Sequence, residues 1–275
     1  DGKGTAVKFA SPRGITSDSS GNLFVIDHEN HSIRKITSDG VASTYAGNGN
    51  YAHQRETGNR LDVGMAYPIA ITFNNAGNEL FFSEEGQHRV SKIDASGNVS
   101  LVSGNGNWGD EVGDKNNAQY RGIGSLAFAS SGHLYVAERQ KIKKLVDDGS
   151  GNWTAENFVG TGDWGEKDGT GTNANFMHIN GIVIDKSGST DVMYVADNNV
   201  IRKVTIPGGV VTTYANTGRN WGDNDGTLAS AQMQNVRGIT QDTSESSLTL
   251  YILDENKLKK VTNDGVETIT GGDYG

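Results

Sequence analysis

Short apolar stretches and polar turns alternate along the whole chain. Residues 23–26 (Leu-Phe-Val-Ile) form a continuous apolar run, whereas residues 33–36 (Ile-Arg-Lys-Ile) alternate apolar with basic side chains. A threonine-rich stretch such as 211–215 comes later in each unit, and Ser-Gly or Asn-Gly turns separate the runs. Alternation predicts strands with one buried face, and glycine-containing dipeptides mark the turns between them. The pattern therefore predicts an all-β chain.

The same pattern occurs five times. The apolar residue near the start of each unit recurs at intervals of 56, 55, 56 and 57 residues, at Ile15, Ile71, Leu126, Ile182 and Ile239. Four short strands per unit, arranged radially, describe a propeller blade. We therefore predict a five-bladed β-propeller with four-stranded antiparallel blades, formed by residues 1–275 as a single domain. The predicted blades are 12–46, 68–103, 122–160, 179–215 and 236–270.

The two ends of the chain predict that the ring is closed. Residues 271–275 (GGDYG) followed by residues 1–9 (DGKGTAVKF) reproduce the linker at 160–176 almost without a gap. We therefore expect the ends to meet and to complete a fifth linker.

The first unit carries a specific motif. Its residues are Gly14-Ile15, Gly21 to Val25, Asp27, Asn30-His31 and Ile33 to Ile36. This motif resembles the NHL repeat, a propeller-blade family, and the resemblance extends over all five units. It implies the propeller fold and, as the most common use of such propellers, a platform for binding other proteins. The signature histidine recurs only as His88.

Composition and charge limit the classes of binding partner that we expect. The net charge is −9, and binding to nucleic acid depends on basic residues that displace counterions, so we expect no nucleic-acid partner. No apolar run approaches the roughly 18–20 residues of a membrane span. The absence of cysteine excludes disulfides and thiol chemistry, and is compatible with the cytoplasm as well as with secretion. We expect a monomeric, secreted, extracellular protein.

The linkers between units supply the candidate binding residues. An aromatic residue recurs there, followed by glycine and an acid in most copies, as in Asn107 to Asp110. An exposed ring can stack on a sugar while carboxylates accept hydrogen bonds from its hydroxyls. The predicted ligand-binding residues are Tyr51, Trp108, Asp110, Trp164, Glu166, Trp221, Asp223, Tyr274 and Asp1. Several weak sites would add up to avidity on a clustered glycan surface.

Structural roles compete with binding at these and other repeated positions. Each linker aromatic is about as well suited to plugging the seam between two blades. The acid after each aromatic run is expected to cap a turn, with ligand contact as the alternative, at Asp27, Glu84, Glu138, Asp197 and Asp254. Cations of the third strands, such as Arg34, Lys92 and Lys144, are expected on a solvated face, and Trp153 is expected to pack.

Catalytic and metal signals are weak. The six histidines show no metal-ligand spacing, and the sequences at 166–169 and 223–226 resemble calcium loops without the terminal glutamate. We therefore expect no catalytic residue, no metal and no cofactor, and predict a multivalent lectin. In plan it resembles five-bladed lectins of N-acetylated sugars, which implies glycans of that kind as partners. The alternatives are an NHL-type protein-interaction platform and a metal-dependent propeller enzyme of the lactonase or lyase kind.

Overall fold

The computed structural model describes residues 1–52, 57–245 and 247–272. Residue contacts divide the chain into two compact units. Unit 1 comprises Asp1–Glu138 with Lys144–Glu156, and unit 2 comprises Arg139–Lys143 with the residues from Asn157 onward. Within the described ranges, no helix combines the length and the apolar character needed to span a bilayer.

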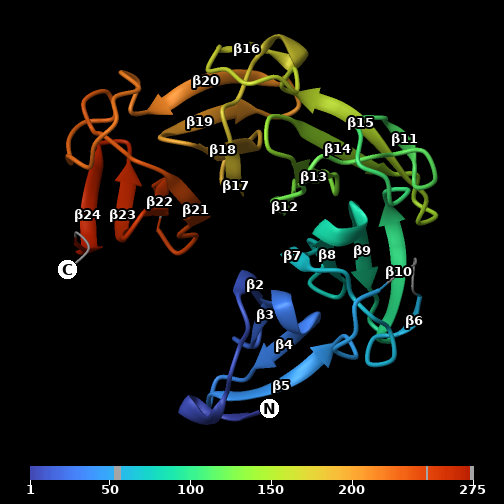
Figure 1. The fold of residues 1–275 in the computed structure, drawn as a ribbon. Helices are drawn as coiled ribbons and strands as arrows, with labels where there is room; N and C mark the ends of the chain where they lie inside the picture. Colours follow the sequence, from blue (N-terminus) through green and yellow to red (C-terminus); the bar gives the residue numbers. More distant parts are fainter. Residues whose placement is uncertain (53–56, 246, 273–275) are drawn as a thin grey trace. The chain divides into compact units, whose positions relative to one another are not determined.

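The strands form five antiparallel sheets, which follow one another along the chain (Figure 1). The first sheet contains β1 (Gly2–Lys3), β2 (Pro12–Ser17), β3 (Leu23–Asp27), β4 (Ser32–Ile36) and β5 (Val41–Ala46). The second contains β6 (Gly58–Asn59), β7 (Pro68–Phe73), β8 (Leu80–Glu84), β9 (Arg89–Ile93) and β10 (Asn98–Ser103). The third contains β11 (Gly113–Asp114), β12 (Ser125–Phe128), β13 (Leu134–Ala137), β14 (Ile142–Asp147) and β15 (Trp153–Val159).

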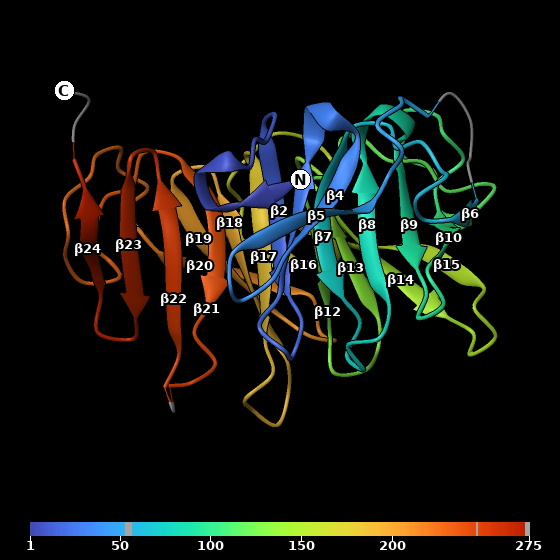
Figure 2. The ribbon, with the colours of Figure 1, turned by 90° about the horizontal axis from the view of Figure 1, so that it is seen from below.

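The last two sheets lie in unit 2. The fourth contains β16 (Gly169–Thr170), β17 (Ile179–Asp185), β18 (Val192–Asp197), β19 (Val200–Thr205) and β20 (Val210–Ala215). The fifth contains β21 (Val236–Gln241), β22 (Thr249–Asp254), β23 (Lys257–Thr262) and β24 (Val266–Gly271), which Figure 2 shows side by side. The described residues also form the short 3₁₀ turns η1 (Gly4–Ala6), η2 (His28–Asn30), η3 (Glu85–Gln87) and η4 (Gly171–Asn173).

These sheets are the blades of a five-bladed β-propeller, which confirms the predicted fold class. The closure of the ring and the single domain stay predictions. Within unit 1 the inner strands β2 and β7 pack on each other, and so do β7 and β12, while in unit 2 β17 packs on β21. Because the second strand of a blade is covered on both faces, it is apolar throughout rather than alternating, as at Phe24, Val25 and Ile26, all of which are buried.

Four of the blades have one more strand than the predicted four. The linker that enters a blade runs along its outer edge and pairs there over two residues, as β1 does with β5 and β16 does with β20. In the fifth blade the same contact is a bridge between Gly226 and Val266. The linker thereby covers the unpaired edge of the outer strand, which would otherwise be open to pairing with another chain.

Candidate functional site

Three tryptophans of the linkers are exposed. The exposed fractions are 56% for Trp108, 72% for Trp164 and 64% for Trp221. Each tryptophan forms a parallel backbone bridge with a residue twelve positions later, and the partners Tyr120, Phe176 and Met233 are fully buried. The buried partner fills the interior, so the indole is left at the surface. The alternative in which these indoles plug a seam is therefore wrong for all three.

An amide side chain lies beside each of these tryptophans. The glycine that follows the indole is packed against it: an added Cβ on Gly165 would lie 2.8 Å from the Cβ of Asn175. Gln119 and Gln232 occupy the same place next to Gly109 and Gly222. At all three linkers the amide thus packs on the glycine that separates the indole from the acid, and these amides were not predicted from the sequence. Their signal is a repeated Ala-amide-apolar triplet ahead of each blade, as in residues 174–176.

Two of the acids that follow the indoles, Glu166 and Asp223, are paired with cations. Glu166 forms an ion pair of 3.5 Å with Arg219, and each side chain of the pair is about a third exposed. Asp223 accepts a hydrogen bond from Lys257, which holds the pKa of the Asp223 carboxyl below its usual value. Asp110 lies at the corresponding position of the linker that contains Trp108. Glu166 and Asp223 thus offer a partly exposed carboxylate next to a cation, which can accept and donate hydrogen bonds to neighbouring hydroxyl groups.

Tyr51 lies in a different environment from the tryptophans. Its ring packs against His31, with centroids 5.7 Å apart, and against Tyr67 at 5.5 Å. Its hydroxyl donates to the carbonyl oxygen of Gly86 at 3.2 Å. The Tyr51 ring is half-buried, so it presents less surface for stacking than the indoles do. Tyr274, the fifth predicted aromatic, lies outside the described residues.

Asp1 lies at a different position from the one predicted for it. Its carboxylate accepts from Arg34 Nη2 at 2.8 Å and from Thr44 Oγ1 at 3.2 Å. Asp168 makes the same contacts in the fourth blade, with Arg202 and Thr213. Asp1 therefore corresponds to Asp168, which lies two residues after the acid that follows the indole. Because it holds the outer strand of its own blade, its contact with a sugar stays a prediction.

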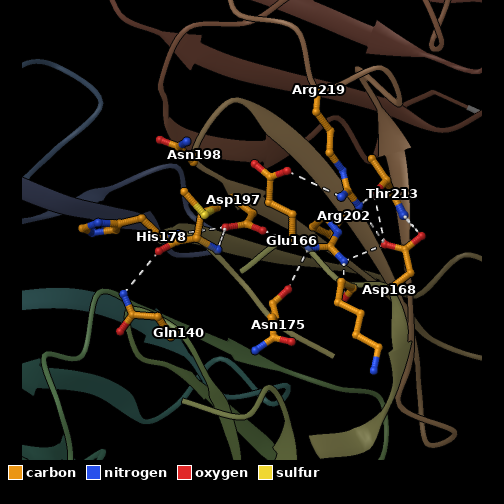
Figure 3. A network of polar contacts seen from close by, with 12 residues as sticks. Gln140, Glu166, Asp168, Asn175, His178, Asp197, Asn198, Arg202, Thr213 and Arg219 are labelled. Atoms are coloured by element: carbon orange, nitrogen blue, oxygen red, sulfur yellow. Dashed lines mark hydrogen bonds and ion pairs between the residues drawn. The ribbon is translucent and has the colours of Figure 1, made fainter. Parts of the chain in front are cut away.

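A buried ion-pair network ties the linker that enters the fourth blade to that blade (Figure 3). Asp197 accepts from the backbone N–H groups of Met177 and His178 at 2.8 and 2.9 Å, and from Arg202 Nη1 at 3.0 Å. Arg202 also donates to Asp168 at 2.7 Å and is fully buried. The repeated acid thus holds the segment entering the blade, which confirms its predicted capping role.

The prediction of a solvated face for the third-strand cations is wrong for Arg34. Arg34 is only 5% exposed and bonds Asp27 and Asp1. Lys92 and Lys144 remain partly exposed and pair with Glu79 and Glu156. Because both faces of a blade pack on neighbouring segments, an alternating pattern does not leave one face in water. The packing role predicted for Trp153 is confirmed, since it is 6% exposed and contacts Phe81.

A metal centre is not evident from the side chains that the structure describes. Among residues 1–52, 57–245 and 247–272, no three histidine, aspartate or glutamate side chains lie together as metal ligands. The predictions of no metal and no catalytic residue stay predictions. The constellation that remains is the exposed indole with its acid and amide.

Comparison with known proteins agrees with the repeat motif. Over 151 residues the chain is 27% identical to NHL repeat-containing protein 2 of Bos taurus. This alignment covers 50% of this chain and 21% of that protein. An auxiliary nutrient binding protein from Bacteroides ovatus is similar in structure, with a TM-score of 0.66, 17% identity, and coverage of 97% of this chain and 60% of that one. A gluconolactonase from Xanthomonas campestris gives a TM-score of 0.64 at 12% identity, covering 96% of this chain and 78% of that one.

Identities this low establish the fold alone, and the chain spans about a fifth of the curated relative. The family model of the teneurin NHL domain matches residues 1–147, which is more than half of the sequence. The chain therefore belongs to the teneurin NHL domain family.

Proposed function

We propose that this chain binds carbohydrate, without catalysis, through the linkers of Trp108, Trp164 and Trp221. The observation that supports this most directly is the exposure of all three indoles at one repeated backbone position. Exposing a large aromatic ring to water is costly, and an exposed apolar surface rimmed by polar groups is typical of a binding site. The acid that follows each indole and the amide packed on the intervening glycine supply the polar groups.

The sites are expected to be individually weak. A stacked ring with two or three hydrogen bonds to hydroxyl groups competes with water for the same contacts, so most of its gross energy is offset. Repetition of the site compensates, since clustered glycans can occupy several linkers of one molecule. The proposed ligands are surface glycans, including N-acetylated sugars, met by a monomeric protein outside the cell. The structurally similar protein from Bacteroides ovatus is an auxiliary nutrient binding protein, which is compatible with this proposal.

Binding to a glycan array tests the proposal. Trp108→Ala, Trp164→Ala and Trp221→Ala are each expected to weaken binding, and the three together to abolish it. The corresponding Phe variants retain a ring and are expected to keep part of the affinity. Val210→Ala, which removes an exposed apolar side chain from β20, is the matched control and should bind like the unaltered protein. Unchanged binding by the triple Ala variant would contradict the proposal.

Two other functions remain as alternatives. An NHL-type interaction platform would use the same indoles on a protein partner, and would then bind no glycan on the array. An enzyme of the lactonase kind would hydrolyse gluconolactone, with a loss of rate on addition of a chelator. Incubation with that substrate, with and without EDTA, separates this class from the two binding classes.

A further inference from the structure

In four blades, the turn that precedes the third strand packs in the same way against the end of the outer strand. Its backbone packs against a glycine at the end of the outer strand, so closely that a Cβ on that glycine would lie 2.2 to 2.6 Å from a carbonyl oxygen of the turn. The pairs are Gly47 with His31, Gly104 with His88, Gly160 with Gln140 and Gly271 with Asn256. This shared contact makes the four turn residues structurally equivalent.

The equivalent position is a histidine in the first two blades only. There the imidazole touches the aromatic residue of the next linker, edge to face. The ring centroids of His88 and Trp108 are 5.2 Å apart with planes at 79°, and those of His31 and Tyr51 are 5.7 Å apart at 83°. In the third blade Gln140 takes this place and donates to the carbonyl oxygen of Met177 at 3.2 Å. The support of the linker is therefore titratable in two blades and not in the third.

The environment of His88 favours the neutral ring. Its Nδ1 atom is buried and has no hydrogen-bond partner among the residues that the structure describes. Burial lowers the pKa of His88, and the charge of Glu85, on the same turn, only partly opposes this. A proton on His88 would add a charge in a place where a buried N–H has no acceptor, and an unpaired buried charge is strongly unfavourable. The protonated ring is therefore expected to move toward water.

We propose that His88 is a positioning residue for Trp108, whose neutral imidazole holds the exposed indole in place and whose protonation releases it. Among the described residues, Glu85 lies on this turn, and the buried pair of Arg89 and Glu84 flanks it and is bonded at 2.6 Å. From the next linker the acid nearest in sequence to the indole is Asp110. His88 is therefore the imidazole on this turn, and it takes up its proton below the ordinary histidine value of 6.5.

The consequence for ligand binding rests on the function proposed above. Acidification is expected to weaken the Trp108 site and to leave the Trp164 and Trp221 sites unchanged. The indole–imidazole coupling itself does not depend on any ligand and is tested separately.

Tryptophan fluorescence of the intact chain carrying Trp164→Phe and Trp221→Phe tests the coupling. Trp108 is then the exposed emitter, over the constant background of the buried Trp153. Between pH of about 5 and about 8, we expect an emission change with a midpoint below the ordinary histidine value of 6.5. His88→Gln, which copies the amide of the third blade, should abolish this change, and His31→Gln should retain it.

A second variant separates titration from support. His88→Phe keeps a ring against the indole but cannot take up a proton, so its emission should stay at the neutral-pH value throughout. Thermal unfolding verifies that each variant is folded. Persistence of the titration in His88→Gln and His88→Phe, or a pH-independent emission of the parent, would overturn the proposal. A lack of glycan binding would overturn the proposed function alone, since the fluorescence measurement needs no sugar.

Discussion

Trp164 and Phe176 are joined by a parallel backbone bridge, yet the indole is 72% exposed and the phenyl ring is fully buried. The two aromatic residues of one linker therefore have separate tasks. Phe176 lies inside, with the guanidinium of Arg202 over its ring at 5.3 Å. Trp164 is left at the surface, and the same division into an exposed indole and a buried partner recurs at Trp108 with Tyr120 and at Trp221 with Met233.

Substitution of the two rings should separate stability from binding. Phe176→Ala is expected to lower the free energy of unfolding by about 3–5 kcal/mol, because it leaves a cavity in a packed interior. Trp164→Ala should change it by no more than about 0.5 kcal/mol, because the indole is at the surface. Urea denaturation measures both values. A large loss of stability in Trp164→Ala would mean that the indole packs after all.

The buried ion pairs should differ in strength between blades. Asp197 is bonded by Arg202 at 3.0 Å, whereas Asp254 is 3.9 Å from Lys259, and its Oδ2 has no hydrogen-bond partner in the described part of the chain. We therefore expect Asp197→Asn to be more destabilising than Asp254→Asn, since the former weakens a bonded charge pair and the latter does not. Arg202→Met, which leaves Asp197 unpaired, should cost about 3–5 kcal/mol. Equal losses for the two Asn variants in thermal denaturation would contradict this ranking.

Replacement of the glycine after the indole by alanine should have a different effect in different linkers. At Gly165 an added Cβ would lie 2.8 Å from the Cβ of Asn175, which cannot move without the backbone. At Gly109 the nearest atom is the terminal oxygen of Gln119, which can rotate away. Gly165→Ala should therefore disturb the Trp164 linker, visible as a shift of its fluorescence, whereas Gly109→Ala should leave stability nearly unchanged. A larger stability loss in Gly109→Ala would refute the packing argument.

Folding stability should decrease on mild acidification. Burial lowers the pKa of His31, His88, His133 and His178 below the ordinary value of 6.5. The unfolded chain consequently binds protons before the folded one as the pH falls through this value, so the free energy of unfolding decreases. Denaturation at pH of about 7.5 and about 5.5 measures the slope. The raised pKa of Asp197 and of Asp254 acts in the opposite direction. The double variant His31→Gln with His88→Gln isolates the contribution of these two histidines. If the pH dependence of the free energy of unfolding were the same in the double variant, the assignment to these histidines would be wrong.

The local pattern of side chains was sufficient to predict the five blades. The recurring apolar run, the acid that follows it and the glycine-containing turns are properties of neighbouring residues, because strand pairing through a short turn depends on local sequence. The blade of residues 12–46 is therefore visible in the order of its residues, and the structure has its strands from Pro12 to Ala46. The capping role of Asp27 and the packing of Trp153 follow from the same local reasoning.

The exposure of side chains was decided by tertiary contacts. Whether Trp164 or Phe176 faces water depends on which of the two meets Arg202, a residue in the third strand of the blade that the linker enters. Arg34 is buried because a distant carboxylate, Asp1, reaches it together with Asp27, and its strand alone predicts a solvated side chain. Periodicity along one strand records which positions alternate, but burial is set by partners far apart in the sequence, so only the folded chain determines it.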